Sequence, residues 1–194
     1  MSETVTFRST RDRILDAVDR LFYRQGIRAV GVDAIAADLG ISKKTLYRLF
    51  PSKDDLVLAY LNGRFRPLPA NSDKPPGEQI LANFDWIARS MSSAKDFRGC
   101  AFLNAIAELG DEDNAARDLA ISYKESRRLW YRQLLTQLDV DDPDTLATQL
   151  ALLLDGAYAA MLVRKDPAMM QAAIAAARVL LKNAGVPLRS PAAA

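Results

Sequence analysis

Residues 32–50 read VDAIAADLGISKKTLYRLF, which has the spacing of two short helices joined by a tight turn. The turn needs a residue that tolerates a positive φ, which Gly40 supplies, and Ser42 can cap the helix that follows. Ala36 is small enough for the helices to cross closely. Apolar residues for the inner faces stand at Ile35, Leu39, Ile41, Leu46 and Leu49. The stretch therefore predicts a helix-turn-helix with helices over about 32–39 and 43–49.

The outer face of the second predicted helix is polar and basic. In a recognition helix the N-terminal residues approach base edges in the major groove, and flanking groups hold phosphates. The start of the next helix is a further phosphate site. Asp33 is left out because its charge would repel a phosphate. A solvated basic face is the alternative interpretation. The predicted DNA contacts are Ser42, Lys43, Lys44, Thr45, Tyr47, Arg48 and Lys53.

Helical periodicity continues along the rest of the chain, without alternating patterns typical of strands. A helix over 10–24 can be capped by Ser9 or Thr10 and ended by Gly26, and Ser52-x-x-Asp55 is a capping box. Further helices are predicted near 77–93, 99–108, 113–138, 143–163 and 167–184. The expected fold is all-α with about nine helices: an N-terminal three-helix DNA-binding domain and a C-terminal helical domain.

The domain boundaries follow from composition. Residues 66–76 form the proline-rich polar stretch expected of a boundary. The predicted division is a DNA-binding domain at 1–51, a connecting helix at 52–66, a C-terminal helical domain at 67–185, and a disordered tail at 186–194. Residues 1–66 hold 12 Lys/Arg and 8 Asp/Glu, a net +4, whereas residues 67–194 hold 14 and 16, a net −2. This asymmetry suits a nucleic-acid partner at the N-terminal end.

Histidine is missing from the sequence, cysteine occurs once, and these features exclude several classes of function. The sequence has no histidine and one cysteine, which excludes His-dependent catalysis, His-based metal sites and an internal disulfide. It has no glycine-rich phosphate loop. Carboxylate, lysine or cofactor chemistry stays open on these grounds, but no enzyme, cofactor or metal is expected. The chain also lacks an apolar signal core and an uncharged apolar run of membrane-spanning length, so a cytoplasmic protein without a membrane partner is expected.

Residues 10–60 carry a recognisable pattern. It runs through Leu21-Phe22 and Gly26, then Ile35-Ala36 and residues 40–50, and closes with Pro51-Ser52-Lys53-Asp54-Asp55-Leu56. This pattern resembles the tetracycline-repressor (TetR) family of bacterial regulators, and residues 99–105 resemble one branch of it. The resemblance implies a dimeric, all-helical repressor that releases DNA when a small molecule enters its C-terminal domain. Residues 67–185 are accordingly expected to be the ligand-binding and dimerisation domain. Two positions depart from the family pattern: Gly31 replaces a Ser or Thr cap, and Asp33 stands where a basic residue is frequent.

Residues 77–184 offer candidates for a ligand pocket and a dimer surface. Aromatic and sulfur-containing side chains suit an apolar ligand, Asn104 and Glu108 share one helix face, and the same apolar side chains also suit an ordinary core. The predicted pocket comprises Phe84, Ile87, Cys100, Leu103, Asn104, Glu108, Trp130 and Tyr158. Apolar stripes on the last two helices suit a four-helix interface or the monomer's own core. The predicted interface comprises Leu150, Leu154, Ala157, Met161, Met170, Ala173, Ile174, Ala177 and Leu181.

These features predict a sequence-specific DNA-binding transcriptional regulator. The expected partners are a second copy of the chain, double-stranded operator DNA and a small apolar or aromatic effector. A palindromic operator is expected because a two-fold dimer doubles the sequence that is read. The favoured role is a repressor that the effector releases from its operator. The alternatives are a ligand-responsive activator, a non-specific architectural DNA binder, and an enzyme with a helix-turn-helix-like head.

Overall fold

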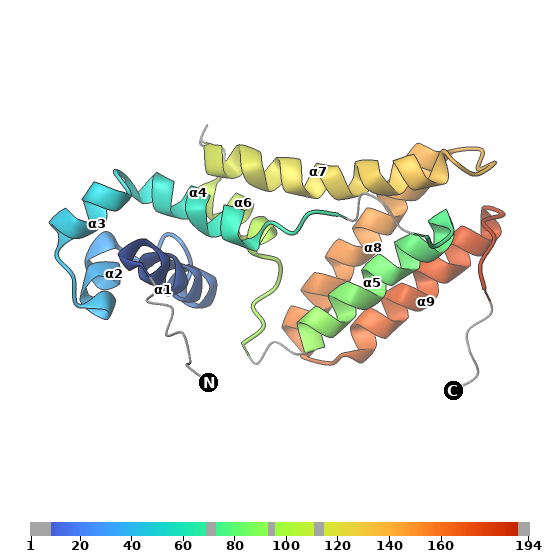
Figure 1. Ribbon diagram of the computed structural model, residues 1–194. Coiled ribbons are helices and arrows are strands. Elements are labelled where there is room, and N and C mark those ends of the chain that lie inside the picture. Colours follow the sequence, from blue (N-terminus) through green and yellow to red (C-terminus); the bar gives the residue numbers. More distant parts are fainter. Residues whose placement is uncertain (1–8, 69–72, 93–95, 111–114, 190–194) are drawn as a thin grey trace, which may run out of the picture. The chain divides into compact units, whose positions relative to one another are not determined.

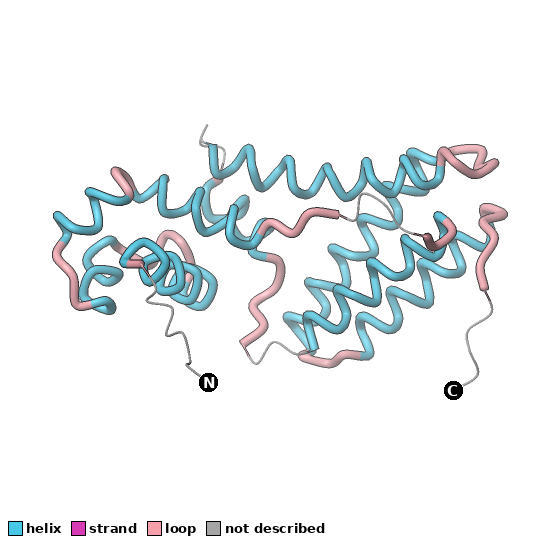
Figure 2. The backbone as a smooth tube through the Cα atoms, in the orientation of Figure 1, coloured by secondary structure: helices cyan, strands magenta, loops and turns pink. Residues whose placement is uncertain are grey.

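The computed structural model describes residues 9–68, 73–92, 96–110 and 115–189. Within these ranges the chain forms nine helices and no strand, which confirms the predicted all-α class (Figures 1 and 2). The helices are α1 Thr10–Gln25, α2 Val32–Leu39, α3 Lys43–Leu49, α4 Lys53–Arg64, α5 Pro76–Ser92, α6 Ala101–Leu109, α7 Ala115–Leu135, α8 Pro143–Arg164 and α9 Ala168–Asn183.

Side-chain caps fix where several helices begin. Ser9 Oγ accepts a hydrogen bond from the Asp12 N–H at 3.1 Å, and Asp12 reaches back to the Ser9 N–H, so α1 starts with a capping box. Ser52 and Asp55 repeat this arrangement at α4, which confirms the predicted box. These reciprocal bonds satisfy backbone N–H groups that a helix start otherwise leaves unpaired.

The chain folds into two compact units. The first unit comprises Met1–Phe65 and Ala101–Ser122, and the second comprises Arg66–Cys100 and Tyr123–Ala194. This division differs from the predicted single C-terminal domain at 67–185, because α6 and the first turns of α7 belong with the N-terminal helices. The Glu108 carboxylate on α6 accepts a hydrogen bond from the Arg28 N–H at 2.9 Å. A contact between residues 80 positions apart cannot be predicted from local periodicity.

In the first unit α1 packs against α2 and α4. Ile14 and Val18 of α1 are fully buried, and the Phe22 and Tyr60 rings meet edge to face with centroids 5.7 Å apart. Arg64 joins α4 to α1 through a bidentate pair with Asp19, at 2.6 and 3.0 Å. These contacts make α4 part of the N-terminal unit, beyond the boundary that the sequence predicted at residue 51.

In the second unit α9 packs against both α5 and α8 (Figure 1). The core between them includes Ile80, Phe84 and Leu150, which have no exposed surface. The chain beyond α9 also joins this core: Val186 is 5% exposed, and the Arg189 N–H donates to Glu78 Oε1 at 2.8 Å. The prediction of a disordered tail from 186 onward is therefore wrong for 186–189, and residues 190–194 lie outside the described ranges.

The close approach of this segment to α5 depends on Gly77. A Cβ added at Gly77 would lie 2.6 Å from Val186 Cγ1 and 2.9 Å from Leu188 Cδ2. We expect Gly77→Ala to lower the free energy of unfolding by about 1–3 kcal/mol, because the buried Val186 must move. Thermal and urea unfolding would measure it. Gly63→Ala is the matched helical control, since its added Cβ meets nothing within 4 Å. Equal stability of the two variants would contradict this packing argument.

Candidate functional site

The turn between α2 and α3 has the geometry of a helix-turn-helix. Gly40 adopts the left-handed conformation, with φ 64° and ψ 33°, which a residue bearing a Cβ adopts only with strain. The Ile41 N–H donates to the Ala36 carbonyl at 3.0 Å and closes the end of α2. Ser42 Oγ then accepts from the Thr45 N–H at 3.1 Å and opens α3. These local interactions turn the chain from α2 into α3 within three residues.

Burial fixes which face of each short helix turns outward. Ile35 and Leu46 have no exposed surface, and Ala36 is 5% exposed. With these residues inward and Leu49 partly buried, the exposed side chains of Lys43, Lys44, Tyr47 and Arg48 lie on the outer side of α3. The structure therefore confirms the division between inner and outer faces that the sequence predicted for α3.

The seven predicted DNA contacts lie together on α3 and at the start of α4. Ser42, Lys43, Lys44, Tyr47 and Arg48 are exposed, and the remaining two, Thr45 and Lys53, are partly buried. Tyr47 keeps 42% of its surface exposed, which is high for a large ring. We call these seven residues the α3 face. Their contacts with DNA remain a prediction.

Asp33 belongs to this surface, although sequence reasoning left it out. Its Oδ1 lies 2.6 Å from Lys43 Nζ, with the two side chains 71% and 55% exposed. The pair joins the first turn of α2 to the first turn of α3. Because both groups are exposed, the pair contributes little to stability. It lowers the positive charge of the α3 face and restrains Lys43.

We expect Asp33→Asn to raise the affinity for random-sequence DNA by about twofold to tenfold, because a charge that repels phosphates is removed. Fluorescence anisotropy at several salt concentrations would measure it, and the affinity should fall more steeply with salt than in the wild type. Asp85→Asn, at an exposed position of α5, removes the same charge elsewhere and serves as the control. Unchanged or weaker binding by Asp33→Asn would contradict this prediction.

The eight predicted pocket residues are divided between the two units, with five in the second unit and three in the first. Phe84 and Ile87 are buried in the core, and the Phe84 and Tyr131 rings stack at 6.1 Å. Three others, Leu103, Asn104 and Glu108, lie on α6 in the first unit, whereas Cys100, Trp130 and Tyr158 lie in the second. Periodicity identified apolar residues correctly, but most of them fill cores. The Glu108 carboxylate, one of the two polar predictions on α6, accepts a hydrogen bond from the Arg28 backbone N–H.

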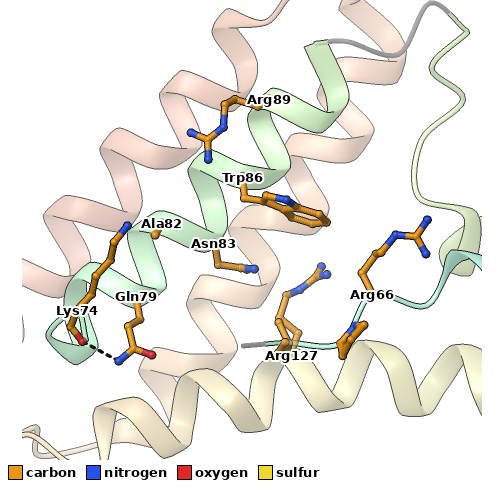
Figure 3. A pocket seen from close by; sticks show the side chains of 10 residues that line it. Arg66, Lys74, Gln79, Ala82, Asn83, Trp86, Arg89 and Arg127 are labelled. Carbon is orange, nitrogen blue, oxygen red and sulfur yellow. Dashed lines mark hydrogen bonds between the residues drawn. The ribbon is translucent and has the colours of Figure 1, made fainter. Parts of the chain in front are cut away.

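A different set of residues lines a cavity of about 470 Å³ in the second unit (Figure 3). Its most prominent side chains are Trp86 of α5, Arg127 of α7 and Arg66, which follows α4. Sequence reasoning missed this cavity because it weighted apolar residues and did not expect a buried arginine. Arg127 is only 5% exposed, which is unusual for its residue type.

The predicted dimer stripe faces the monomer's own core. Eight of its nine residues are buried, from Leu150 and Leu181 at 0% to Ala173 at 7%, and Ile174 is partly buried against the same core. The prediction of these residues as an interface is therefore wrong, and they form the contacts of α8 and α9 with each other and with α5. The spacing was helical as expected, but spacing alone does not say which partner an apolar stripe meets.

The opposite faces of α8 and α9 carry exposed apolar and small residues. Leu152 is 64% exposed, Val163 is 82% exposed and Val179 is 56% exposed. Exposed small residues continue the two stripes, at Gly156, Ala159, Ala172 and Ala175. We call these seven residues the α8/α9 outer face. Contiguous exposed apolar surface of this kind marks an interaction site.

Among the helices of the described residues, α8 alone is long and apolar enough to cross a membrane, by length and composition only. Its Asp155 forms an ion pair with Lys124 of α7, and its buried leucines pack in the second unit. Only 33% of its most apolar window is buried within the chain. A helix that is apolar on two sides is expected where one side meets its own core and the other meets a partner.

Known proteins resemble this chain in both sequence and fold. The model of the TetR family of bacterial regulatory proteins matches residues 14–60. SCO4454, a TetR-family transcriptional regulator from Streptomyces coelicolor, is 32% identical with a TM-score of 0.82, over 90% of this chain and 95% of that chain. The HTH-type transcriptional regulator YjdC of Escherichia coli is 26% identical over 181 residues, which are 90% of this chain and 94% of that protein.

A third relative is the HTH-type transcriptional repressor KstR of Rhodococcus jostii. It is 34% identical over 84 residues, which are 43% of this chain and 40% of that protein. The agreement thus extends from the helix-turn-helix, where the family model matches, to nearly the whole fold, where SCO4454 matches. This chain belongs to the TetR family of bacterial transcription regulators.

Proposed function

We propose that this chain is a homodimeric repressor that binds a palindromic operator through its α3 face and is released by a small-molecule effector. The observation that carries the proposal is the α3 face itself: a capped helix behind a left-handed Gly40, with Lys44, Tyr47 and Arg48 exposed. Side chains at these positions suit base edges and phosphates in a major groove. The repressor KstR is among the relatives, which supports this sign of regulation.

Dimerisation is proposed through the α8/α9 outer face, in place of the stripe that the sequence suggested. One α3 reads too few base pairs for useful specificity, so two copies related by a two-fold axis are needed. Two helices from each copy would form a four-helix interface. The exposed glycine and alanines let helices approach closely, and Leu152 and Val163 would become buried there.

The proposed effector site is the cavity of the second unit. Arg66 lines the cavity immediately after α4, and Arg127 lies on α7, whose first turns belong to the first unit. The chain therefore runs directly from the cavity into the unit that carries the α3 face. An effector shifts the DNA-binding equilibrium only by its difference in affinity between the bound and released states.

A regulatory role also fits the kinds of protein that resemble this chain, since the relatives named above are regulators rather than enzymes. We propose that it acts in the cytoplasm, where bacterial operator DNA lies. The test is binding of the purified chain to the DNA that flanks its own coding region, with unlabelled competitor and a salt titration.

Saturable, competitor-resistant binding that weakens steeply with salt is expected, and the protected segment should contain two half-sites about one helical turn or more apart. Selection from random-sequence DNA would find an operator that lies elsewhere. Failure to enrich any sequence in that selection would overturn the proposed function, and enrichment without a half-site repeat would overturn the dimeric mode of binding.

A further inference from the structure

The cavity of the second unit is lined by positive charge. Arg66, Lys74, Arg89 and Arg127 contribute side chains to it, and none of the residues that the structure places along its wall is acidic. Its volume of about 470 Å³ is within the range of small-molecule sites. A cavity with this lining favours an anionic occupant, and the individual contacts of its buried residues narrow the choice.

Arg127 is a buried cation whose hydrogen bonds are incomplete. Its Nη2 donates to the Tyr123 hydroxyl at 2.8 Å, whereas its buried Nε has no hydrogen-bond partner. Within the described ranges no carboxylate forms an ion pair with it. Burial raises the pKa of the nearby Tyr131 and Tyr158 phenols, so these remain neutral and supply no compensating charge. A charge held in this way is unfavourable unless an anion meets it.

Asn83 adds a second, oriented donor beside Arg127. The Tyr131 hydroxyl donates to Asn83 Oδ1 at 2.8 Å, which fixes the amide so that its Nδ2 is the donating end toward the cavity. Asn83 is only 9% exposed. Figure 3 shows Asn83 and Arg127 reaching the cavity from α5 and α7 respectively. Two neighbouring donors of this kind match the two oxygens of a carboxylate.

Trp86 supplies the apolar part of the site. Trp86 lies one turn along α5 from Asn83 and has the largest side chain of the residues that line the cavity (Figure 3). It is 44% exposed, so the ring is accessible to a ligand. The flat ring offers a stacking surface for a planar group. An occupant that satisfies Arg127, Asn83 and Trp86 together is therefore an anion attached to a flat apolar body.

We propose that the effector is a small aromatic carboxylate, with its carboxylate on Arg127 and Asn83 and its ring against Trp86. The binding site stands on the structure alone. The consequence for DNA, that this ligand releases the operator, rests on the proposed function. The sequence suggested a small apolar or aromatic effector, and a neutral molecule of that kind would leave the Arg127 charge unmatched.

Calorimetric titration of the full chain with benzoate, 1-naphthoate and indole-3-acetate, each beside its primary amide, tests the site. At least one acid is expected to bind with one molecule per chain and about tenfold or more tighter than its amide, because charge-assisted hydrogen bonds are the stronger kind. Equal affinities within every pair, or no binding by any of the acids at millimolar concentration, would overturn the proposal. This comparison uses the wild-type protein and needs no variant to fold.

Arg127→Gln should weaken binding of the acid by about tenfold to a hundredfold and change binding of the amide by less than about twofold. Arg128→Gln is the matched control, since the neighbouring arginine pairs with Glu125 and Asp144 instead of lining the cavity. Trp86→Ala, at a half-exposed position, should weaken both acid and amide. Loss of acid binding in Arg128→Gln but not in Arg127→Gln would place the anion elsewhere and overturn the assignment.

Adding the tightest-binding acid to the complex of wild-type protein with its selected operator separates the two proposals. Release of the DNA at the concentration that saturates the cavity supports both. Binding that depends on Arg127 without release keeps the carboxylate site but overturns its regulatory role. Specific operator binding by a protein that binds none of the acids leaves the proposed DNA function standing and overturns the inference about the effector.

Discussion

Replacing Lys44 with alanine is expected to weaken binding to the operator by about thirtyfold or more. Lys44 is exposed in the first turn of α3, and its removal takes away a base or phosphate contact worth about 1–3 kcal/mol. A two-fold dimer loses the contact at both half-sites, which doubles the loss of binding free energy. Alanine is a good helix former, so α3 should remain folded. Fluorescence anisotropy with the selected operator would measure the affinity.

Two controls separate this effect from a general loss of charge. Lys182→Ala removes the same charge from an exposed position at the end of α9 and should leave operator affinity within about twofold. The wild-type and Lys44→Ala proteins should also have the same unfolding temperature. Wild-type operator affinity of Lys44→Ala would remove this residue from the contacts and require the α3 face to dock differently.

Replacing Leu152 with aspartate is expected to convert the dimer into a monomer at micromolar concentration. Leu152 is 64% exposed in the single chain, so the substitution buries no charge within the monomer. In a two-fold interface it would bury two carboxylates without partners, each costing several kcal/mol, and should raise the dimer dissociation constant at least about a hundredfold. Sedimentation would distinguish the 21.4 kDa chain from its dimer, and operator binding should fall in parallel.

Leu129→Asp is the matched control for this experiment. Leu129 is 44% exposed on α7 and is not one of the seven residues of the α8/α9 outer face, so its substitution should leave the dimer intact. Circular dichroism should show native helix content in both variants. A Leu152→Asp protein that sediments as a dimer at nanomolar concentration would reject the α8/α9 outer face as the interface, while a monomeric wild type would reject dimerisation itself.

These two experiments probe features of different origin. The α3 face could be predicted from the sequence because every requirement of a helix-turn-helix is local. Gly40 allows the turn between α2 and α3, Ser42 caps α3, and the period of a helix fixes which residues lie opposite Leu46. Interactions between residues three or four positions apart carry enough information to specify such a unit. The capping box at Ser52 and Asp55 could be predicted for the same reason, because its two residues are three positions apart.

The dimer surface could not be predicted from local interactions. Leu150 and Leu152 are two positions apart on α8, yet the first is fully buried in the monomer and the second is 64% exposed. The helix carries apolar residues on both faces, so periodicity offered two stripes without saying which faces α5 and α9. Only the packing of the three helices decided it.

The all-helical fold, the helix-turn-helix and the residues of its outer face could be predicted from the sequence, because short-range hydrogen bonds and helical periodicity specify them. The tertiary structure alone decided the division into two units, the burial of Arg127 beside Asn83 and Trp86, and the pairing of Glu108 with the Arg28 backbone. Those features join residues 40 to 80 positions apart in the chain. Their energies depend on which surfaces are buried against each other and which charges are desolvated, and the local spacing of residues determines neither.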